Sequence, residues 1–335
     1  MSLVLYGGNM TDSGISGALA IVQKAAKPLY NLVKVTGPFL IAQSKTAVEN
    51  YSDFKLNKAR LEAISALLQE EVKNISAERS TLRDKIANST GLERVRAQND
   101  YDLLTKEINK LSTVEKIKDF IGDNEVVDEN IEIYDNWIDK FNQLASSLNE
   151  EWRKQLLAKA FALELKKPGT VNLLTLNCIA SFDEKTFRIF GFLVNSSIRL
   201  YEINFLPVID AKKSFRINDE EFNIDKAGYE LGHLNLLSFG DNGYLKIENK
   251  DIYMRYGRRV MRIRRPEHPW IQEPNSKIYA TFFTPLGNNI ASLYTRSLND
   301  YGNDNFDRLL AEAKGKKFVY QEIEMSEQLY SELGN

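Results

Sequence analysis

Residues 61–95 read LEAISALLQEEVKNISAERSTLRDKIANSTGLERV, and this stretch decides the architecture of the first half of the chain. Apolar residues recur close to a heptad spacing and form one stripe along a helix: Leu61, Ile64, Leu68, Val72, Ile75 and Leu82. The NSTG segment, residues 88–91, marks a turn. The stripe resumes beyond it at Leu92, Val95, Leu104, Ile108, Leu111 and Ile117. The sequence predicts two long helices, as an antiparallel hairpin within one chain or as a coiled coil between chains.

Shorter helices are expected in residues 131–196. Asn149, which two glutamates follow, is a suitable N-cap for a helix that runs to Lys167 and is stopped by Pro168-Gly169. Asp183 is expected to begin a further helix through FRIFGFLV. These signals predict a compact helical core after the long helices.

Beyond Ser196 the pattern changes from helical to mixed. SIRLYEINFLPVI, residues 197–209, has strand character, and residues 246–266 contain two strand-like runs around Tyr256-Gly257. Thr284-Pro285 is a strong helix start, because a threonine N-cap precedes a proline in the first turn. The predicted fold class is therefore α+β and mostly α-helical.

The chain of 335 residues is longer than one core usually allows, so several structural units are expected. We place them at residues 1–48, 49–125, 126–196 and 197–335. The 43% hydrophobic content is typical of a folded protein, and the net charge of −2 gives no overall attraction to nucleic acid or membrane. The single cysteine, Cys178, has apolar neighbours, which indicates a buried thiol and a reducing, cytoplasmic setting.

Residues 17–43, GALAIVQKAAKPLYNLVKVTGPFLIAQ, form a cationic apolar segment. No aspartate or glutamate occurs between Ser13 and Val48. The pattern is amphipathic, helix breakers interrupt it, and no charge-free run reaches the roughly 20 apolar residues of a bilayer span. It is either a buried packing helix or a segment that meets an anionic membrane when released, so the protein is expected to be cytoplasmic and conditionally membrane-associated. The candidate membrane residues are Ile15, Leu19, Val22, Lys24, Lys27, Leu29, Lys34 and Phe39.

No catalytic signature stands out, and no cofactor or metal site is predicted. The two histidines, His233 and His268, lack ligand spacing, and no phosphate-binding loop is present. Asp241 and the ENKD segment, residues 248–251, resemble a metal-dependent nuclease site only weakly, and the segment is better explained as a polar turn. The protein is expected not to be an enzyme.

A basic run is the second candidate site. Its arginines lie within eleven residues: Arg255, Arg258, Arg259, Arg262, Arg264 and Arg265. On a strand hairpin they would suit a phosphate backbone, where each contact adds salt-dependent affinity. Solvation or pairing within the chain, and an acidic protein partner, remain open as alternatives.

Several motifs resemble an uncharacterised bacterial family, domain of unknown function 2806. They are NWIDKF (136–141), the helix ending in Ala-x-Glu-x-Lys-Lys-Pro-Gly (162–169), DEKTFRIF (183–190), ELGHLNLL (230–237) and FFTPLGNNIASL (282–293). The resemblance implies a helical core, a winged-helix-like C-terminal unit, frequent residence near phage-defence genes and no assigned chemistry. From the residues alone, Trp137 and Phe141 share a helical face and indicate structure, and Glu164 belongs to a solvated charge cluster.

The resulting hypothesis is a non-enzymatic anti-phage defence effector, similar to abortive-infection proteins. Its C-terminal unit would sense a phage or cellular component, the long helices would oligomerise, and the N-terminal helices would act on the inner membrane or form a pore. Expected partners are a second copy, the trigger and an anionic membrane surface. The alternatives are a nucleic-acid-binding winged-helix-like regulator that uses the basic run, and a cryptic metal-dependent nuclease.

Overall fold

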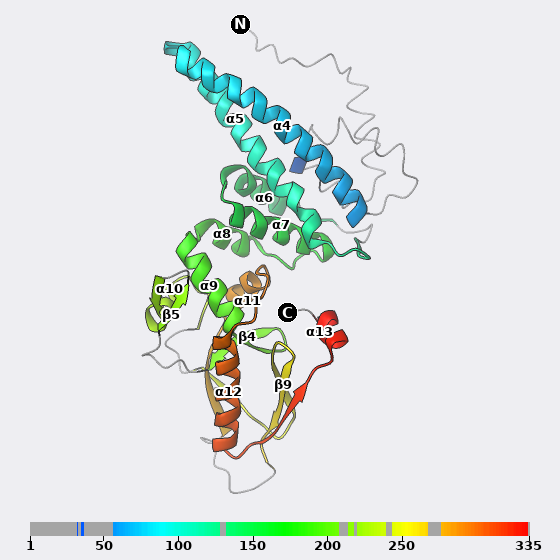
Figure 1. Ribbon diagram of the computed structural model, residues 1–335, viewed down its shortest axis with the longest axis vertical. Coiled ribbons are helices and arrows are strands. Elements are labelled where there is room, and N and C mark those ends of the chain that lie inside the picture. Colours follow the sequence, from blue (N-terminus) through cyan, green and yellow to red (C-terminus); the bar gives the residue numbers. More distant parts are fainter. Residues whose placement is uncertain are drawn as a thin grey trace. The chain divides into compact units, whose positions relative to one another are not determined.

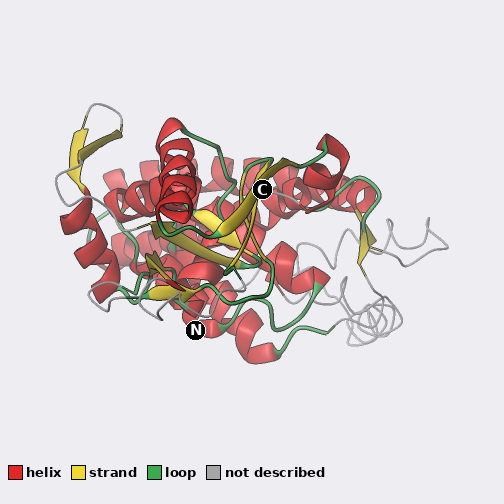
Figure 2. Cartoon of the chain, turned by 90° about the horizontal axis from the view of Figure 1, so that it is seen from below, coloured by secondary structure: helices red, strands yellow, loops and turns green. Residues whose placement is uncertain are grey.

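The structure is a computed structural model that describes residues 32, 35–36, 56–127, 132–207, 214–217, 220–238, 243–266 and 276–333. The chain divides into two compact units, Met1–Ala180 and Ser181–Asn335, which we call the N-terminal and C-terminal units. This division falls inside the segment 126–196. Helices predominate (Figure 2), and most strands of the described residues belong to the C-terminal unit. The predicted α+β, mostly helical class is confirmed.

The N-terminal unit is built on a pair of long helices, α4 (Lys58–Asn88) and α5 (Gly91–Glu115), joined by a two-residue turn (Figure 1). Contacts between them show an antiparallel register. Ser65 donates to Glu115 over 2.9 Å, Lys85 and Glu93 are 3.7 Å apart beside the turn, and Arg79 lies over the Tyr101 ring. The hairpin forms within one chain, and a coiled coil with a second chain stays a prediction.

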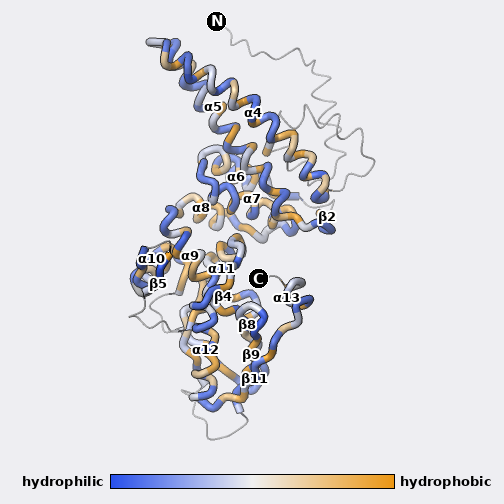
Figure 3. Tube along the Cα trace, in the orientation of Figure 1, coloured by the Kyte–Doolittle hydropathy of each residue, from blue (hydrophilic) through white to orange (hydrophobic). Residues whose placement is uncertain are grey.

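The apolar stripe is buried only in part. Blue and orange residues alternate along both helices in Figure 3, as amphipathic helices require. Leu61, Leu68 and Leu111 are buried, but Leu92 and Val95 near the turn are 76% and 55% exposed. They do not lie in the seam between α4 and α5, where the buried residue near the turn is Ala97.

Shorter elements complete the N-terminal unit. They are η1 (Lys116–Phe120), β1 (Leu56–Asn57), its antiparallel partner β2 (Val126–Val127), α6 (Asp135–Ser147), α7 (Glu151–Lys166) and α8 (Leu173–Ser181). Trp137 and Phe141 are buried and stacked, with ring centroids 5.6 Å apart. The predicted N-cap at Asn149 was one residue too early, since Glu150 occupies that position.

Glu164 corrects a second prediction. Its side chain is not solvated but 1% exposed, at the end of α7. Its two oxygens accept the backbone N–H groups of Gly169 (2.6 Å) and Val171 (3.0 Å). The indole of Trp137 donates to the Val171 carbonyl over 2.6 Å. The carboxylate therefore holds together the corner that Pro168-Gly169 makes, where Gly169 has a φ of +84°.

The C-terminal unit contains a seven-stranded antiparallel sheet in the order β11-β9-β8-β3-β4-β10-β7. Its strands are β3 (Ile198–Leu200), β4 (Ile203–Pro207), β7 (Tyr244–Lys246), β8 (Ile252–Tyr256), β9 (Arg259–Arg264), β10 (Lys277–Phe282) and β11 (Val319–Glu324). The two predicted strand-like runs of the basic segment are β8 and β9. The winged-helix-like arrangement stays a prediction.

One face of this sheet carries the core of the C-terminal unit. Helix α12 (Asp300–Gly315) contacts β3, β4, β8 and β11. Its apolar residues Phe306, Leu309 and Ala313 join every second residue of the strands, including Met254 and Met261, in one buried cluster. Because side chains alternate across a strand, the intervening residues of β3, β8 and β9 lie on the opposite face.

The remaining elements surround the sheet. They are α9 (Glu184–Ser196), the separate hairpin of β5 (Ser214–Ile217) and β6 (Glu220–Asn223), α10 (Ile224–His233), α11 (Pro285–Ala291) and α13 (Glu327–Leu333). The predicted start of α11 is confirmed, because the Thr284 side chain accepts the N–H of Gly287 over 2.9 Å.

The candidate membrane residues Ile15, Leu19, Val22, Lys24, Lys27, Leu29, Lys34 and Phe39 lie outside the described residues. From the same segment the structure describes Leu32, Val35 and Thr36, which are helical and buried. Within the described part of the chain, none of the helices combines the length and the apolar character needed to pass through a bilayer.

Candidate functional site

Two arginines lie side by side on the sheet face opposite α12. Arg199 of β3 and Arg255 of β8 are direct cross-strand partners. The same row continues through Val260 of β9 to Ile323 of β11, since each is paired with its neighbour. Like charges directly opposite in a sheet repel each other, so this placement costs stability unless another group compensates.

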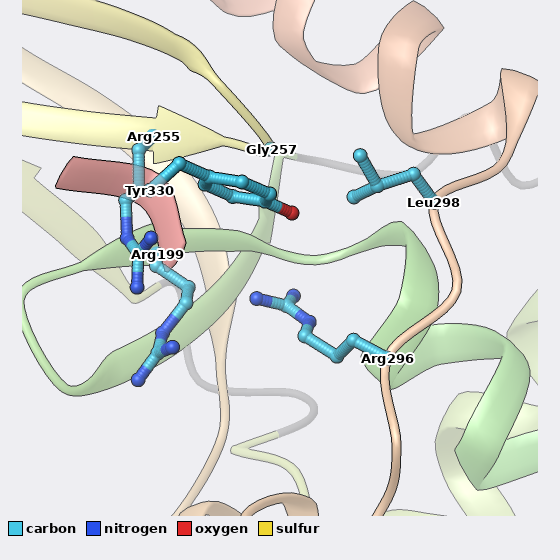
Figure 4. A pocket seen from close by; sticks show the side chains of 6 residues that line it. All are labelled: Arg199, Arg255, Gly257, Arg296, Leu298 and Tyr330. Carbon is cyan, nitrogen blue, oxygen red and sulfur yellow. The ribbon is translucent and has the colours of Figure 1, made fainter. Parts of the chain in front are cut away.

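A third arginine, Arg296, joins them from the segment between α11 and α12. Its guanidinium points toward Arg199 and Arg255 from the other side of a small pocket (Figure 4), whose volume of about 10 Å³ has room for about one water molecule. It donates hydrogen bonds to the carbonyls of Val194 and Ser197, each at 2.6 Å. Val194 belongs to the last turn of α9, where a cation interacts favourably with the helix dipole.

Helix α13 supplies the fourth polar group of this pocket. The phenol ring of Tyr330 lies beside Arg255, and its hydroxyl points toward Leu298 and the guanidinium of Arg296 (Figure 4). Gly257 completes the wall in a two-residue turn at a φ of +57°. We call Arg199, Arg255 and Arg296 the arginine cluster.

Burial acts on all three of these guanidinium groups, and repulsion by a neighbouring arginine adds to its effect at Arg199 and Arg296. Burial, with the charges of Arg199 and Arg255 as smaller contributions, lowers the pKa of Arg296 to about 10. Burial also lowers the pKa of Arg199, and the charge of Arg255 adds to this effect. Burial likewise lowers the pKa of Arg255. Burial therefore disfavours the charged form of each guanidinium, and the negative charge of Glu202 offsets part of this effect at Arg199.

A larger cavity of about 710 Å³ adjoins the arginine cluster and shares Arg199 and Arg255 with it. This volume lies within the range of small-molecule sites. Its further lining residues come from the β3–β4 turn, β8, β9 and the segment from β11 to α13: Tyr201, Glu202, Tyr253, Met254, Val260, Ile323, Glu324, Met325, Ser326, Leu329 and Leu333. One end of the combined site is cationic, and the rest is largely apolar and aromatic.

The predicted basic run is divided by the structure. Arg255 belongs to the arginine cluster, whereas three of the others form ion pairs within the unit. Arg258 pairs with Glu324 (3.2 Å), Arg259 with Glu322 and Asp307, and Arg262 with Asp251 (2.6 Å). Arg264 and Arg265 are half-buried at the end of β9. The structure thus shows pairing within the chain for Arg258, Arg259 and Arg262.

The other residues considered from the sequence lie apart from this site. Cys178 is buried in α8, and burial raises the pKa of its thiol to about 11. His233 stacks edge-on against Tyr229, and Glu248 is exposed in the connection between β7 and β8. His268 and Asp241 lie outside the described residues, among which no group of three or more His, Cys, Asp or Glu is arranged for a metal ion.

Comparison with known proteins identifies the family. Residues 95–305 match the family model described as "Protein of unknown function (DUF2806)", which is more than half of the chain. The chain belongs to the DUF2806 family. The resemblance inferred from its motifs is therefore confirmed, whereas no curated protein and no solved structure matches the chain.

In this DUF2806 protein the matched region contains all three arginines of the cluster, and Tyr330 lies beyond it. Sequence reasoning identified Arg255 but missed Arg199, Arg296 and Tyr330. The alternation in SIRLYEIN could have placed Arg199 on the polar face of a strand. Arg296 and Tyr330 carry no comparable signal, because their positions depend on contacts between distant segments.

Proposed function

We propose that this DUF2806 protein is a non-enzymatic binding protein whose C-terminal unit recognises a phosphate-bearing anion at the arginine cluster. The observation that carries the proposal is the convergence of three guanidinium groups and a phenol hydroxyl on one pocket. These groups offer positive charge and hydrogen-bond donors, which phosphate oxygens accept in short, charge-assisted bonds.

Inorganic pyrophosphate is the probe for this proposal. We expect the full chain to bind it in isothermal titration calorimetry at low ionic strength, with an affinity that falls as salt is added. Replacing Arg255 with methionine keeps an unbranched apolar stem but removes the charge. We expect Arg255→Met to weaken pyrophosphate binding at least 10-fold, on the order of 1.4 kcal/mol for the loss of one charge-assisted contact.

The matched control is Arg188→Ala. Arg188 is an arginine of α9 that pairs with Glu184 at 2.6 Å and does not line the pocket. An exposed pair of this kind contributes little stability, so this variant is expected to fold and to bind like the wild type. Equal weakening by both variants, or no binding of pyrophosphate by the wild type, would show that the arginine cluster is not an anion site.

In the whole protein, we propose that ligand binding is the sensing step of a bacterial anti-phage effector that acts on the inner membrane. The support for membrane action is the cationic segment, in which four lysines and no acidic residue occur between Ser13 and Val48. Leu32, Val35 and Thr36 are buried, so these three residues would have to be released before they could enter an anionic surface. The protein would then be cytoplasmic at rest and membrane-associated when triggered.

Dye leakage from anionic liposomes tests the membrane step in the full chain, with and without pyrophosphate. We expect leakage to decrease several-fold when Lys24, Lys27 and Lys34 are all replaced by glutamate, because electrostatic attraction to anionic lipid contributes about 1 kcal/mol per lysine. Zwitterionic liposomes are the control and are expected to leak little. A wild-type protein that neither binds nor permeabilises anionic liposomes would remove membrane action from the proposal.

Two finer parts of the architecture belong to the same proposal. The α4–α5 hairpin is proposed to associate with a second copy as a coiled coil, and the C-terminal unit is proposed to be winged-helix-like. Nucleic-acid binding through the basic run is the weaker function, since Arg258, Arg259 and Arg262 already pair with carboxylates. A cryptic nuclease is weaker still and is tested by loss of metal-dependent cleavage in Glu248→Ala.

A further inference from the structure

We infer that the phosphate-bearing ligand is a nucleotide that occupies the larger cavity, with its phosphates against Arg199 and Arg255 and its base against the tyrosines. This inference rests on the proposed function and specifies the ligand class of the same site. The juxtaposition that carries it is a cavity of about 710 Å³ that is lined by Arg199 and Arg255 of the arginine cluster and by two exposed tyrosines. Recognition of a phosphate alone would require only the arginines and not the rest of the cavity.

Arg199 and Arg255 line the cavity as well as the small pocket. A ligand held by these arginines therefore places whatever is attached to its phosphate over the sheet face beyond them. Next to Arg255 on this face are Val260 and Ile323 of the same cross-strand row. Leu329 and Leu333 of α13 also line this space. Apolar walls on the sheet and on α13 suit a flat, weakly polar ring.

Two tyrosines provide aromatic faces for such a ring. Tyr201 and Tyr253 line the cavity and are 68% and 44% exposed. Covering an exposed tyrosine ring with a planar ligand is energetically favourable. Every nucleobase has a π face that can stack on such a ring. Arg255 follows Tyr253 by two residues on β8 and so shares its side of the strand.

The backbone conformation at Tyr201 is unusual for a tyrosine. Leu200 and Ile203 are paired, so Tyr201 and Glu202 form a two-residue hairpin turn. Tyr201 has a φ of +54°, a conformation that favours glycine at the first position of such a turn. Its ring is mostly exposed and contributes little packing. A tyrosine at a strained, solvent-facing position is explained by contact with a ligand.

Polar groups of the cavity complement a base as well as its phosphates. Glu202 and Glu324 line the space, and Glu324 is also paired with Arg258 at 3.2 Å. Carboxylates accept hydrogen bonds from the ring N–H and amino groups of bases.

The test compares ADP, GDP, CDP and UDP with inorganic pyrophosphate in titration calorimetry on the full chain. We expect at least one nucleoside diphosphate to bind 10-fold or more tightly than pyrophosphate, because the base adds stacking to the same phosphate contacts. Tyr253→Ala is expected to weaken nucleotide binding about 10-fold and to leave pyrophosphate binding unchanged. Arg255→Met is expected to weaken both ligands.

A second variant, Tyr201→Gly, separates ligand contact from folding. Glycine adopts a positive φ without strain, so this variant is expected to keep the turn intact. Its nucleotide affinity is expected to fall several-fold. If pyrophosphate binds and no nucleotide binds more tightly, the nucleotide assignment is overturned while the anion site stands. If Tyr201→Gly and Tyr253→Ala leave nucleotide affinity unchanged, the base does not occupy this cavity. If neither pyrophosphate nor a nucleotide binds, the proposed function itself fails.

Discussion

Replacing Gly287 with alanine is expected to lower the free energy of unfolding of the C-terminal unit by about 3 kcal/mol or more, the upper range for overpacking. A methyl group at this position in α11 would lie 2.0 Å from the Leu236 carbonyl oxygen and 2.9 Å from its carbon. That carbonyl accepts the N–H of Thr284 over 3.0 Å, so it cannot move away without breaking this bond. Helix α11 and the segment that contains Leu236 would have to move apart.

Calorimetric unfolding of the full chain measures this effect, and a loss of about 3 kcal/mol corresponds to a Tm decrease of roughly 10 °C for a unit of this size. Gly315→Ala is the matched control. Gly315 ends α12, and an added methyl group there meets no atom within 4 Å. The control is expected to be as stable as the wild type or slightly more stable, by less than about 1 kcal/mol. Equal stability of the two variants would contradict the close approach of α11 to Leu236.

Replacing Glu164 with alanine is expected to destabilise the N-terminal unit by about 3 kcal/mol, because it removes two charge-assisted hydrogen bonds. The N–H of Val171 would lose its acceptor at a residue that is 1% exposed, and the Gly169 N–H would lose its partner as well. Urea unfolding followed by tryptophan fluorescence measures the change. Glu150→Ala, which removes a carboxylate that is partly exposed at the start of α7, is the control and is expected to cost much less.

Glu164→Gln adds a pH test, because glutamine keeps the shape and does not titrate. Burial raises the pKa of Glu164 above its ordinary value of 4.5, against the lowering effect of the hydrogen bonds from Gly169 and Val171. The folded protein then retains a proton that the unfolded chain has released, so this group's contribution to stability falls as pH rises from 4.5 through the raised pKa. The stability advantage of the wild type over Glu164→Gln should shrink across this window. An advantage that grows instead would show that the backbone hydrogen bonds outweigh burial.

The helices that local patterns predict agree with the structure. The apolar spacing of residues 61–82 gives α4, the Thr284-Pro285 start gives α11, and Asp183 caps α9 by accepting the N–H of Thr186. These features depend on residues within a few positions of one another, so the local sequence is sufficient to predict them. The errors arise where distant segments compete for a residue. In the sequence Glu164 resembles a solvated charge, but in the folded chain the corner at Gly169–Val171 buries it.

The sequence by itself determined the mostly helical α+β class, the long helices, the strand character of β3, β4, β8 and β9, and the family. Only the tertiary structure decided which arginines stand together. Arg199 and Arg255 meet because β3 and β8, more than fifty residues apart, are neighbours in the sheet. Arg296 and Tyr330 reach them from two further segments. Strand order and helix docking follow from the burial of apolar surface over the whole unit. They therefore cannot be predicted from the spacing of residues within any one segment.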